Sequence, residues 1–233
     1  NGRLNATGGL DVTGPFTVEN GASVIGTLDA DGNITSTGTV SGATMTSVGD
    51  TNVGGNLNVT GNSSVTGNST VSGNLTTTGT STSGNISTGT IAATGNITTT
   101  SAVNAATLTT SGDASINGNS SVTGDSSVTG NLSIDGKTTV TGDITTSAAI
   151  NAATLNTSGN ATIAGTLNNT GDITTPAAVN ASTLNSTGNT NVGGNAVITG
   201  NTTISGDNNV IGNSIIGGDS SISGNSNISG NST

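Results

Sequence analysis

The sequence predicts an all-β protein: a single-chain parallel β-solenoid of triangular section, with a coil period of about 17–18 along the sequence. Three observations predict this fold. Glycine recurs every sixth residue over long stretches, one aliphatic residue recurs at a constant place between the glycines, and the spacings of three and four that mark a helix are absent. The clearest stretch has glycine at 112, 118, 124, 130, 136 and 142.

Each unit of six is numbered here from its glycine. Position +1 is mostly Asn or Asp, +2 is usually small, +3 and +5 are mostly Ser or Thr, and +4 is Ile or Val. Alternate residues of a strand point to opposite faces, so +2 and +4 should lie inside and +3 and +5 outside. The predicted core residues at +4 are Val59, Val65, Val71, Ile116, Val122, Val128, Ile134, Val140, Ile198, Ile204, Val210, Ile216, Ile222 and Ile228.

The glycines are expected at the corners between short strands. A chain that turns sharply every six residues needs residues that take positive φ, which Gly does freely and Asn and Asp tolerate best among the others. The repeated Gly-Asn and Gly-Asp pairs are therefore interpreted as turns on a lattice.

Along the chain, residues 1–50 are the least regular, although corners six apart can be placed at Gly14, Asn20, Gly26, Gly32 and Gly38. We interpret 1–50 as an irregular N-terminal part of the solenoid, with a cap or attachment region as one reading. Residues 51–233 are the regular hexad-repeat solenoid. The whole chain should hold about 13 coils in a rod roughly 60 Å long at the β spacing.

Three related segments, Ile97–Leu108, Ile144–Leu155 and Ile173–Leu184, each lie between glycines 17 apart. Seventeen is three sixes minus one, so each segment predicts a coil with one side a residue short. In these segments the large aliphatic residue moves from +4 to +2 on every side. The three coils begin on different corners, so their short sides should fall on three different faces and leave the rod nearly straight.

Composition sets limits on the fold and the function. The chain of 233 residues has one Phe and no Trp, Tyr, Cys or His, which suits only a narrow core of small and aliphatic side chains. Disorder is disfavoured because only 6% of residues are charged and the aliphatics follow the lattice. The net charge of −10, with Arg3 and Lys137 as the two basic residues, excludes a nucleic-acid surface of the usual kind. No apolar run is long enough for membrane insertion.

The unit, as in Val122-Thr-Gly124, resembles the hexapeptide repeat of left-handed parallel β-helices over most of the chain. This resemblance implies a left-handed solenoid. The best-known members of that family are acyltransferases with a catalytic His, and because this chain has no His their activity does not carry over. The texture of residues 59–70, VTGNSSVTGNST, also looks like the repetitive shafts of phage tail fibres and bacterial surface adhesins.

Stacked coils should bring the corner residues of successive coils together. At a spacing of 18, Asn195, Asn213 and Asn231 should form a hydrogen-bonded ladder along the axis. The same spacing places Asp125 beside Asp143, a like-charge pair whose repulsion is small after screening.

The sequence contains few residues that could form a catalytic or metal-binding site. Without His or Cys there is no usual nucleophile–base pair or thiolate metal site, so we expect no enzyme and no cofactor. Asp29, Asp31 and Asn33 are a weak Ca²⁺ candidate because alternating oxygen ligands suit that ion, but no bidentate Glu follows, and an acidic corner is the favoured interpretation. Glycosylation sequons such as those at Asn62 and Asn119 arise automatically where a Gly-Asn corner precedes a Ser/Thr-rich strand.

The function expected from the sequence is structural: a subunit of an extracellular or cell-surface fibre, filament or adhesin stalk. The scarcity of Lys and Arg leaves a trypsin-like protease little to cleave, and the start at Asn1 without Met indicates a processed product or a fragment. Nothing from Gly188 to Thr233 resembles a cap, so we expect the chain itself to be the partner, in a head-to-tail homopolymer.

Two alternatives are kept. One is an ice-binding solenoid, for which Ile97–Thr100 and Thr107–Thr109 are the nearest Thr-rich stretches, although Thr alternates with Ser and Asn across all sides. The other is a shaft of three intertwined chains, as in a trimeric phage-type fibre.

Overall fold

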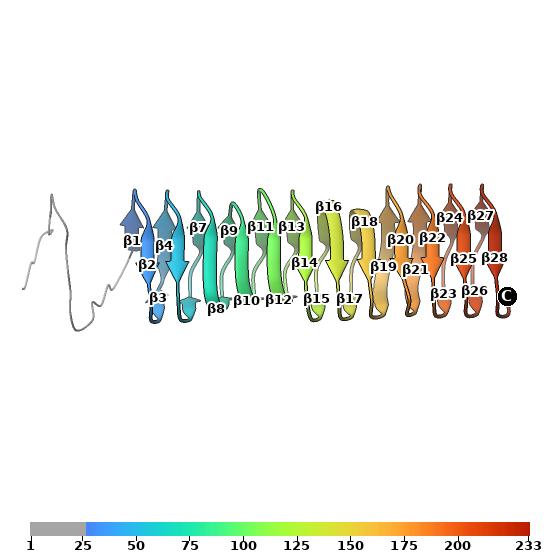
Figure 1. Cartoon of the computed structure of the whole chain (residues 1–233), viewed down its shortest axis with the longest axis horizontal. Helices are drawn as coiled ribbons and strands as arrows, with labels where there is room; N and C mark the ends of the chain where they lie inside the picture. Colours follow the sequence, from blue (N-terminus) through green and yellow to red (C-terminus); the bar gives the residue numbers. More distant parts are fainter. Residues whose placement is uncertain (1–26) are drawn as a thin grey trace, which may run out of the picture.

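One chain winds into a straight rod of about 12 turns (Figure 1). The computed structural model describes residues 27–233, in which 28 strands form a single parallel sheet. A single chain supplies all three sides of every turn, so the shaft of three intertwined chains is wrong for this fold. The corners proposed at Gly14, Asn20 and Gly26 lie outside the described residues, and the left-handed sense stays a prediction.

The sheet is folded into three faces, which are named by their first strands. Face 1 consists of β1 (Thr27–Ala30), β4 (Thr44–Ser47), β7 (Ser63–Val65), β9 (Ser81–Ser83), β11 (Ile97–Thr99), β13 (Ala114–Ile116), β24 (Thr202–Ile204) and β27 (Ser220–Ile222), with parts of β16 (Leu132–Val140), β18 (Ile150–Thr157), β19 (Ala161–Asn169) and β21 (Val179–Ser186). Seven strands, β16 among them, continue across a corner and so belong to two faces.

The other two faces follow in chain order. Face 2 consists of β2 (Ile34–Ser36), β5 (Thr51–Val53), β14 (Ser120–Val122), β20 (Ile173–Thr175), β22 (Thr190–Val192), β25 (Asn208–Val210) and β28 (Ser226–Ile228), with parts of β8 (Ser69–Thr77), β10 (Ile86–Ala93), β12 (Val103–Thr110), β16 and β18. Face 3 consists of β3 (Val40–Gly42), β6 (Leu57–Val59), β15 (Ser126–Val128), β17 (Ile144–Thr146), β23 (Ala196–Ile198) and β26 (Ser214–Ile216), with parts of β8, β10, β12, β19 and β21.

The inside of the rod is filled as the alternation predicts. In β14, Ser120 and Val122 are buried and Ser121 between them is exposed, and the same pattern recurs along the chain. Of the predicted +4 core residues, those from Val59 to Val210 are buried. Ile216, Ile222 and Ile228 are only partly buried, because β27 and β28 have a described neighbour on one side only and β26 is covered on its other side only by the short stretch 231–233.

In the three related segments the aliphatic residue does occupy +2. Ile97, Val103 and Leu108 are fully buried there. The +4 position of these coils is then taken by Ala on one side and by Thr or Ser on the other two, and these hydroxyls are satisfied near the corner. Thr110 donates from Oγ1 to the Gly95 carbonyl at 2.7 Å, and Thr157 donates to the Gly142 carbonyl at 3.0 Å. A bonded hydroxyl can therefore replace an aliphatic side chain inside the rod at little desolvation cost.

The corner glycines are needed for a different reason from the one expected. No glycine among the described residues has a φ in the left-handed region, so the expectation of positive φ is wrong. A Cβ on Gly142 would instead lie 2.7 Å from the Gly124 carbonyl carbon and 2.8 Å from its oxygen, one coil earlier. Successive corners stack backbone on backbone, and glycine leaves the most room for the β spacing between coils, although small side chains are present at the equivalent corners Ser101 and Ala148.

The corner Asn and Asp residues form axial ladders, but through the main chain. Asn195 Oδ1 accepts the N–H of Asn213 at 2.9 Å, and Asn213 Oδ1 accepts that of Asn231 at 2.9 Å. Asp125 likewise accepts the N–H of Asp143 at 2.9 Å. The bond needs one acceptor oxygen, which an amide and a carboxylate both supply, so the two residue types alternate at this position.

Within residues 27–233 the turns differ in length because six corners are one residue short. The sequence offset between in-register neighbours is 18 for Ser120 and Thr138, 17 for Ile86 and Val103, and 16 for Ser81 and Ile97. The short corners lie at 40–45 and 179–184 between faces 3 and 1, at 81–86 and 150–155 between faces 1 and 2, and at 86–91 and 103–108 between faces 2 and 3. The three short sides predicted from the three related segments are thus confirmed to fall at three different places around the rod.

Candidate functional site

The outer surface is built from two side chains per side, at +3 and +5. The +3 residue stands in the middle of each short strand, and the +5 residue stands where the strand meets the corner. Shallow troughs run along the rod between these two rows. One of about 450 Å³ lies on face 1, and one of about 280 Å³ lies on face 3. These troughs are the concave surfaces on which a ligand could contact several coils at once.

Face 1 carries an amide ladder in its trough. Asn168 donates from Nδ2 to Asn151 Oδ1 at 3.0 Å, and Asn185 donates from Nδ2 to Asn168 Oδ1 at 2.9 Å. The amides therefore satisfy one another along the axis, as in other stacked β structures. The three-residue ladder extends over three coils and ends where Ser133 and Thr203 take the +3 position.

Asn169, the residue next to this ladder in the chain, faces the interior. Its side chain is only 4% exposed, and neither its amide nitrogen nor its amide oxygen has a hydrogen-bond partner. It lies in register with Ala152 and Ser186, two small residues. An unpaired buried amide is destabilising, so this residue is a weak point of the core rather than a binding group.

Face 3 carries the most uniform outer surface. Over six consecutive coils its +3 and +5 positions hold only Thr, Ser and Ala, and ten of the twelve carry a hydroxyl. We call this set the face-3 array. Both rows face outward. The inner row, at +3 along the middle of the strands, is Thr76, Ala92, Thr109, Ser127, Thr145 and Thr162. The edge row, at +5 beside the corner, is Thr78, Thr94, Ser111, Thr129, Ser147 and Ala164.

The edge row is held in place by bonds along the axis. Thr94 donates from Oγ1 to the Thr78 carbonyl at 2.6 Å, Ser111 donates to the Thr94 carbonyl at 2.6 Å, and Ser147 donates to the Thr129 carbonyl. Each of these hydroxyls keeps its oxygen as an outward acceptor in a fixed orientation.

The Thr-rich stretches picked out in the sequence do not come together. Thr98 of the first stretch lies on face 1 and Thr109 of the second lies on face 3. Thr107 sits at a corner, where its Oγ1 donates to Thr90 Oγ1 at 3.1 Å. Stacking the coils at a constant spacing does not reveal the face-3 array. The smaller sequence offsets across the short corners are the signal that would have aligned its two rows.

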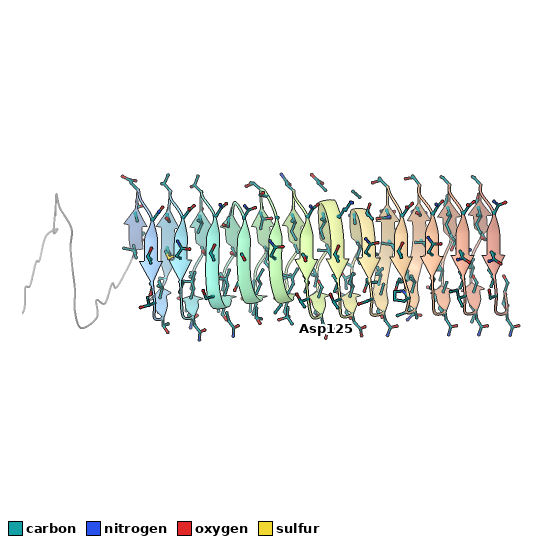
Figure 2. All side chains as sticks on the ribbon, in the orientation of Figure 1. Asp125 is labelled. Atoms are coloured by element: carbon teal, nitrogen blue, oxygen red, sulfur yellow. The ribbon has the colours of Figure 1, made fainter. Side chains whose placement is uncertain are left out.

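The acidic side chains lie mainly at the corners. Asp125 projects from an edge of the rod (Figure 2). Of the weak Ca²⁺ candidate, Asp29 is exposed on β1 and the Asn33 Oδ1 accepts the Asp50 N–H at 2.7 Å. Within residues 27–233 no three His, Cys, Asp or Glu side chains gather as metal ligands would. The candidate therefore remains a sequence prediction.

The sequon asparagines are found at the same corners. Asn62 Oδ1 accepts the Thr80 N–H at 3.2 Å, and Asn119 Oδ1 accepts the Lys137 N–H at 2.9 Å. These asparagines have a structural role in the axial ladders, which accounts for their presence without a glycan.

Comparisons of the chain with protein-family models, with curated proteins and with solved structures found no match. In the described part of the chain no helix has the length and apolar character to span a membrane. Function must therefore be inferred from the fold and its surfaces.

Proposed function

We propose that the chain is a structural rod, a subunit or stalk segment of an extracellular fibre or filament, with no catalytic role. The observation that carries this proposal is the unbroken parallel sheet of 28 strands around one continuous core. A rod about 60 Å long at the β spacing resists bending because every coil is bonded to the next on three faces.

Bonding along the axis goes beyond the main chain and supports a mechanical role. The corner ladders add side-chain acceptors: for example, Asp113 Oδ1 accepts the N–H of Asn131 at 2.8 Å. The +4 and +5 hydroxyls add further bonds, as from Thr175 to the Gly159 carbonyl at 3.0 Å. A pull along the axis would have to break several of these bonds at each coil.

The self-association part of the proposal concerns the edge formed by β27, β28 and residues 231–233. Among the described residues, β27 and β28 are paired only with the preceding coil, whereas β26 also pairs with residues 231–233 through the Ser214–Ser232 bridge. The edge of β27, β28 and 231–233 therefore presents a row of N–H and C=O groups outward. The N–H of Asn208 bonds forward to the Asn225 carbonyl, and the equivalent Ser226 N–H therefore points to the open side. This edge has the geometry to accept one further coil of the same section, and we propose a second copy in that place.

The test is electron microscopy and size-exclusion chromatography of the whole chain at increasing concentration. We expect straight filaments that keep the β spacing across each joint. Dispersed monomers at high concentration would overturn the homopolymer and leave the stalk segment. Fibre formation on cells that make the protein, detected with an antibody, tests the extracellular location. A purely intracellular signal would contradict it.

A matched pair of variants makes the polymer test sharper. Ser226→Pro removes an outward N–H without removing a bond to the preceding coil, so it should block filament growth. Ser226→Ala keeps the N–H and should polymerise like the parent chain. Equal growth of the two variants would contradict stacking through this edge.

A further inference from the structure

The face-3 array is a regular two-dimensional lattice of small side chains, ten of the twelve with a hydroxyl group. Positions +3 and +5 are two residues apart along a strand, about 6.7 Å, and coils repeat at about 4.8 Å. The register of β8, β10, β12, β15, β17 and β19 keeps both rows aligned over six coils. A trough of about 280 Å³ runs between the rows in the first four of these coils.

The positions of the short corners explain why, within the coils of the array, face 3 alone has two unbroken rows. A short corner removes the +5 residue at the edge where it occurs. The two short corners after face 3 lie at 40–45 and 179–184, before and after the array. The edges after faces 1 and 2 have short corners at 81–86, 86–91, 103–108 and 150–155, which interrupt their edge rows within the same coils.

Charge selects the class of ligand. The array holds no charged side chain, while Asp125 and Asp143 lie at the edge before face 3 and Asp113 lies at the edge after it. Acidic edges on both sides disfavour an anionic ligand and also side-by-side packing of a second copy, with its net charge of −10, against face 3. A neutral ligand can approach the array without this repulsion.

The side chains narrow the choice further. The single aromatic residue, Phe16, lies outside the described part, so the array has no aromatic platform of the kind that stacks on a sugar ring. What it offers is ten hydroxyl groups at regular spacing, seven of which belong to Thr and are accompanied by a methyl group. A ligand that repeats in two dimensions can contact all six coils at once, and the ordered water lattice of ice is neutral, periodic and rich in hydrogen-bond donors.

We propose that the face-3 array binds a face of an ice crystal. The edge-row hydroxyls already donate along the axis, so their oxygens are pre-oriented to accept hydrogen bonds from lattice water. Preorganisation of this kind lowers the entropic cost of binding, because the side chains lose little freedom when they meet the lattice. This inference depends on the fold alone and goes beyond the structural role proposed above.

The test is partition of the whole chain into growing polycrystalline ice, together with thermal hysteresis of its solutions. The parent chain should be enriched in the ice fraction at least several-fold over an inert protein of similar size. The double variant Thr109→Lys, Thr145→Lys should lose this enrichment, because two long charged side chains would hold the lattice away from the inner row.

The matched control is Ser121→Lys, Thr139→Lys, which makes the same change at exposed +3 positions of face 2. It should partition like the parent chain, and circular dichroism should show the same fold for both double variants. Absence of the parent chain from ice, or equal loss in both variants, would overturn the proposal. Enrichment on microcrystalline cellulose but not on ice would also overturn it, in favour of a polysaccharide surface.

The same samples separate this inference from the fibre proposal. Electron microscopy reports filament growth through the edge of β27, β28 and residues 231–233, which the face-3 substitutions do not touch. Filaments without ice binding would remove only the ice-binding face, and ice binding without filaments would remove only the polymer.

Discussion

At the scale of single residues, the narrow interior makes each inward position decisive. Val122 is 1% exposed and packs in a column in which Ala105 and Val140 are its in-register neighbours. Ser121, one residue earlier, points outward. The two positions differ in environment as strongly as any adjacent pair in the rod.

Val122→Asp should therefore lower the free energy of unfolding by about 3–5 kcal/mol, because an unpaired charge would enter the apolar column. Ser121→Asp should change the free energy of unfolding by less than about 0.5 kcal/mol. Thermal and denaturant melts of the two variants measure the difference. Equal shifts in both would mean that the inside and outside positions are wrongly assigned.

Asn169 provides the opposite experiment, a core substitution that should stabilise. Both atoms of its amide are buried without a partner, and the column to which it belongs holds Ile134 two coils earlier and Ile204 two coils later. Asn169→Val should raise the free energy of unfolding by about 1–3 kcal/mol, because it removes an unsatisfied polar group and adds apolar contact. The melting midpoint measures this, and an unchanged or lower value would indicate that the amide is paired, for example by an internal water.

At the scale of the element, the corner is a contact between backbones. Gly142→Ala would place its Cβ 2.7 Å from the Gly124 carbonyl carbon and against Asp125 Oδ1. We expect a loss of about 1–3 kcal/mol in the free energy of unfolding from this overpacking. Gly54→Ala is the matched control, because its closest contact is 3.2 Å and Ser or Thr usually fills that +5 position. Denaturant melts showing equal effects would contradict the close-approach account.

The element scale also shows what the sequence could and could not predict. Strand alternation alone placed Val122 inside and Ser121 outside, and the shift of Ile97 and Leu108 to +2 was visible in the repeat. The reason for the corner glycines could not be predicted, because their role depends on the distance between coils rather than on local conformation. The passage with glycines at 84, 89 and 95 was ambiguous for a similar reason. It contains two successive short corners, so the turn from Ser81 to Ile97 is two residues shorter than a full turn. Only the strand pairing establishes this.

The face-3 array depends on the same long-range information. The sequence offset between neighbouring members of a row, such as Thr76 and Ala92, changes from one coil to the next, and its value depends on the corners between them. A constant period mixes Thr with Asn along the rows, whereas the true registers bring only Thr, Ser and Ala together in the face-3 array. A repeat sequence thus predicts reliably whether a residue faces the interior or the solvent. It predicts which residue is its neighbour along the axis only when the length of every corner is known.

At the scale of the whole molecule, the six short corners are distributed evenly. Two lie on each of the three edges, and the axis of the rod is straight (Figure 1). A short corner draws its edge of the coil inward, so an unequal distribution would tilt successive coils toward one side. The even distribution is the physical reason that variation in turn length leaves the rod unbent.

This balance can be broken on purpose. Inserting one Thr before Gly89 and one Ser before Ala106 restores full corners at 86–91 and 103–108, and the edge between faces 2 and 3 then has none of the short corners. We expect the axis to bend near these coils, toward the edges that keep their short corners, and small-angle scattering and electron microscopy to record the curvature. The control inserts one residue at 40–45, 86–91 and 150–155, which removes one short corner from each edge and should leave the rod straight. Two straight rods would show that corner length is absorbed locally and that hydrogen bonding between coils alone sets the axis.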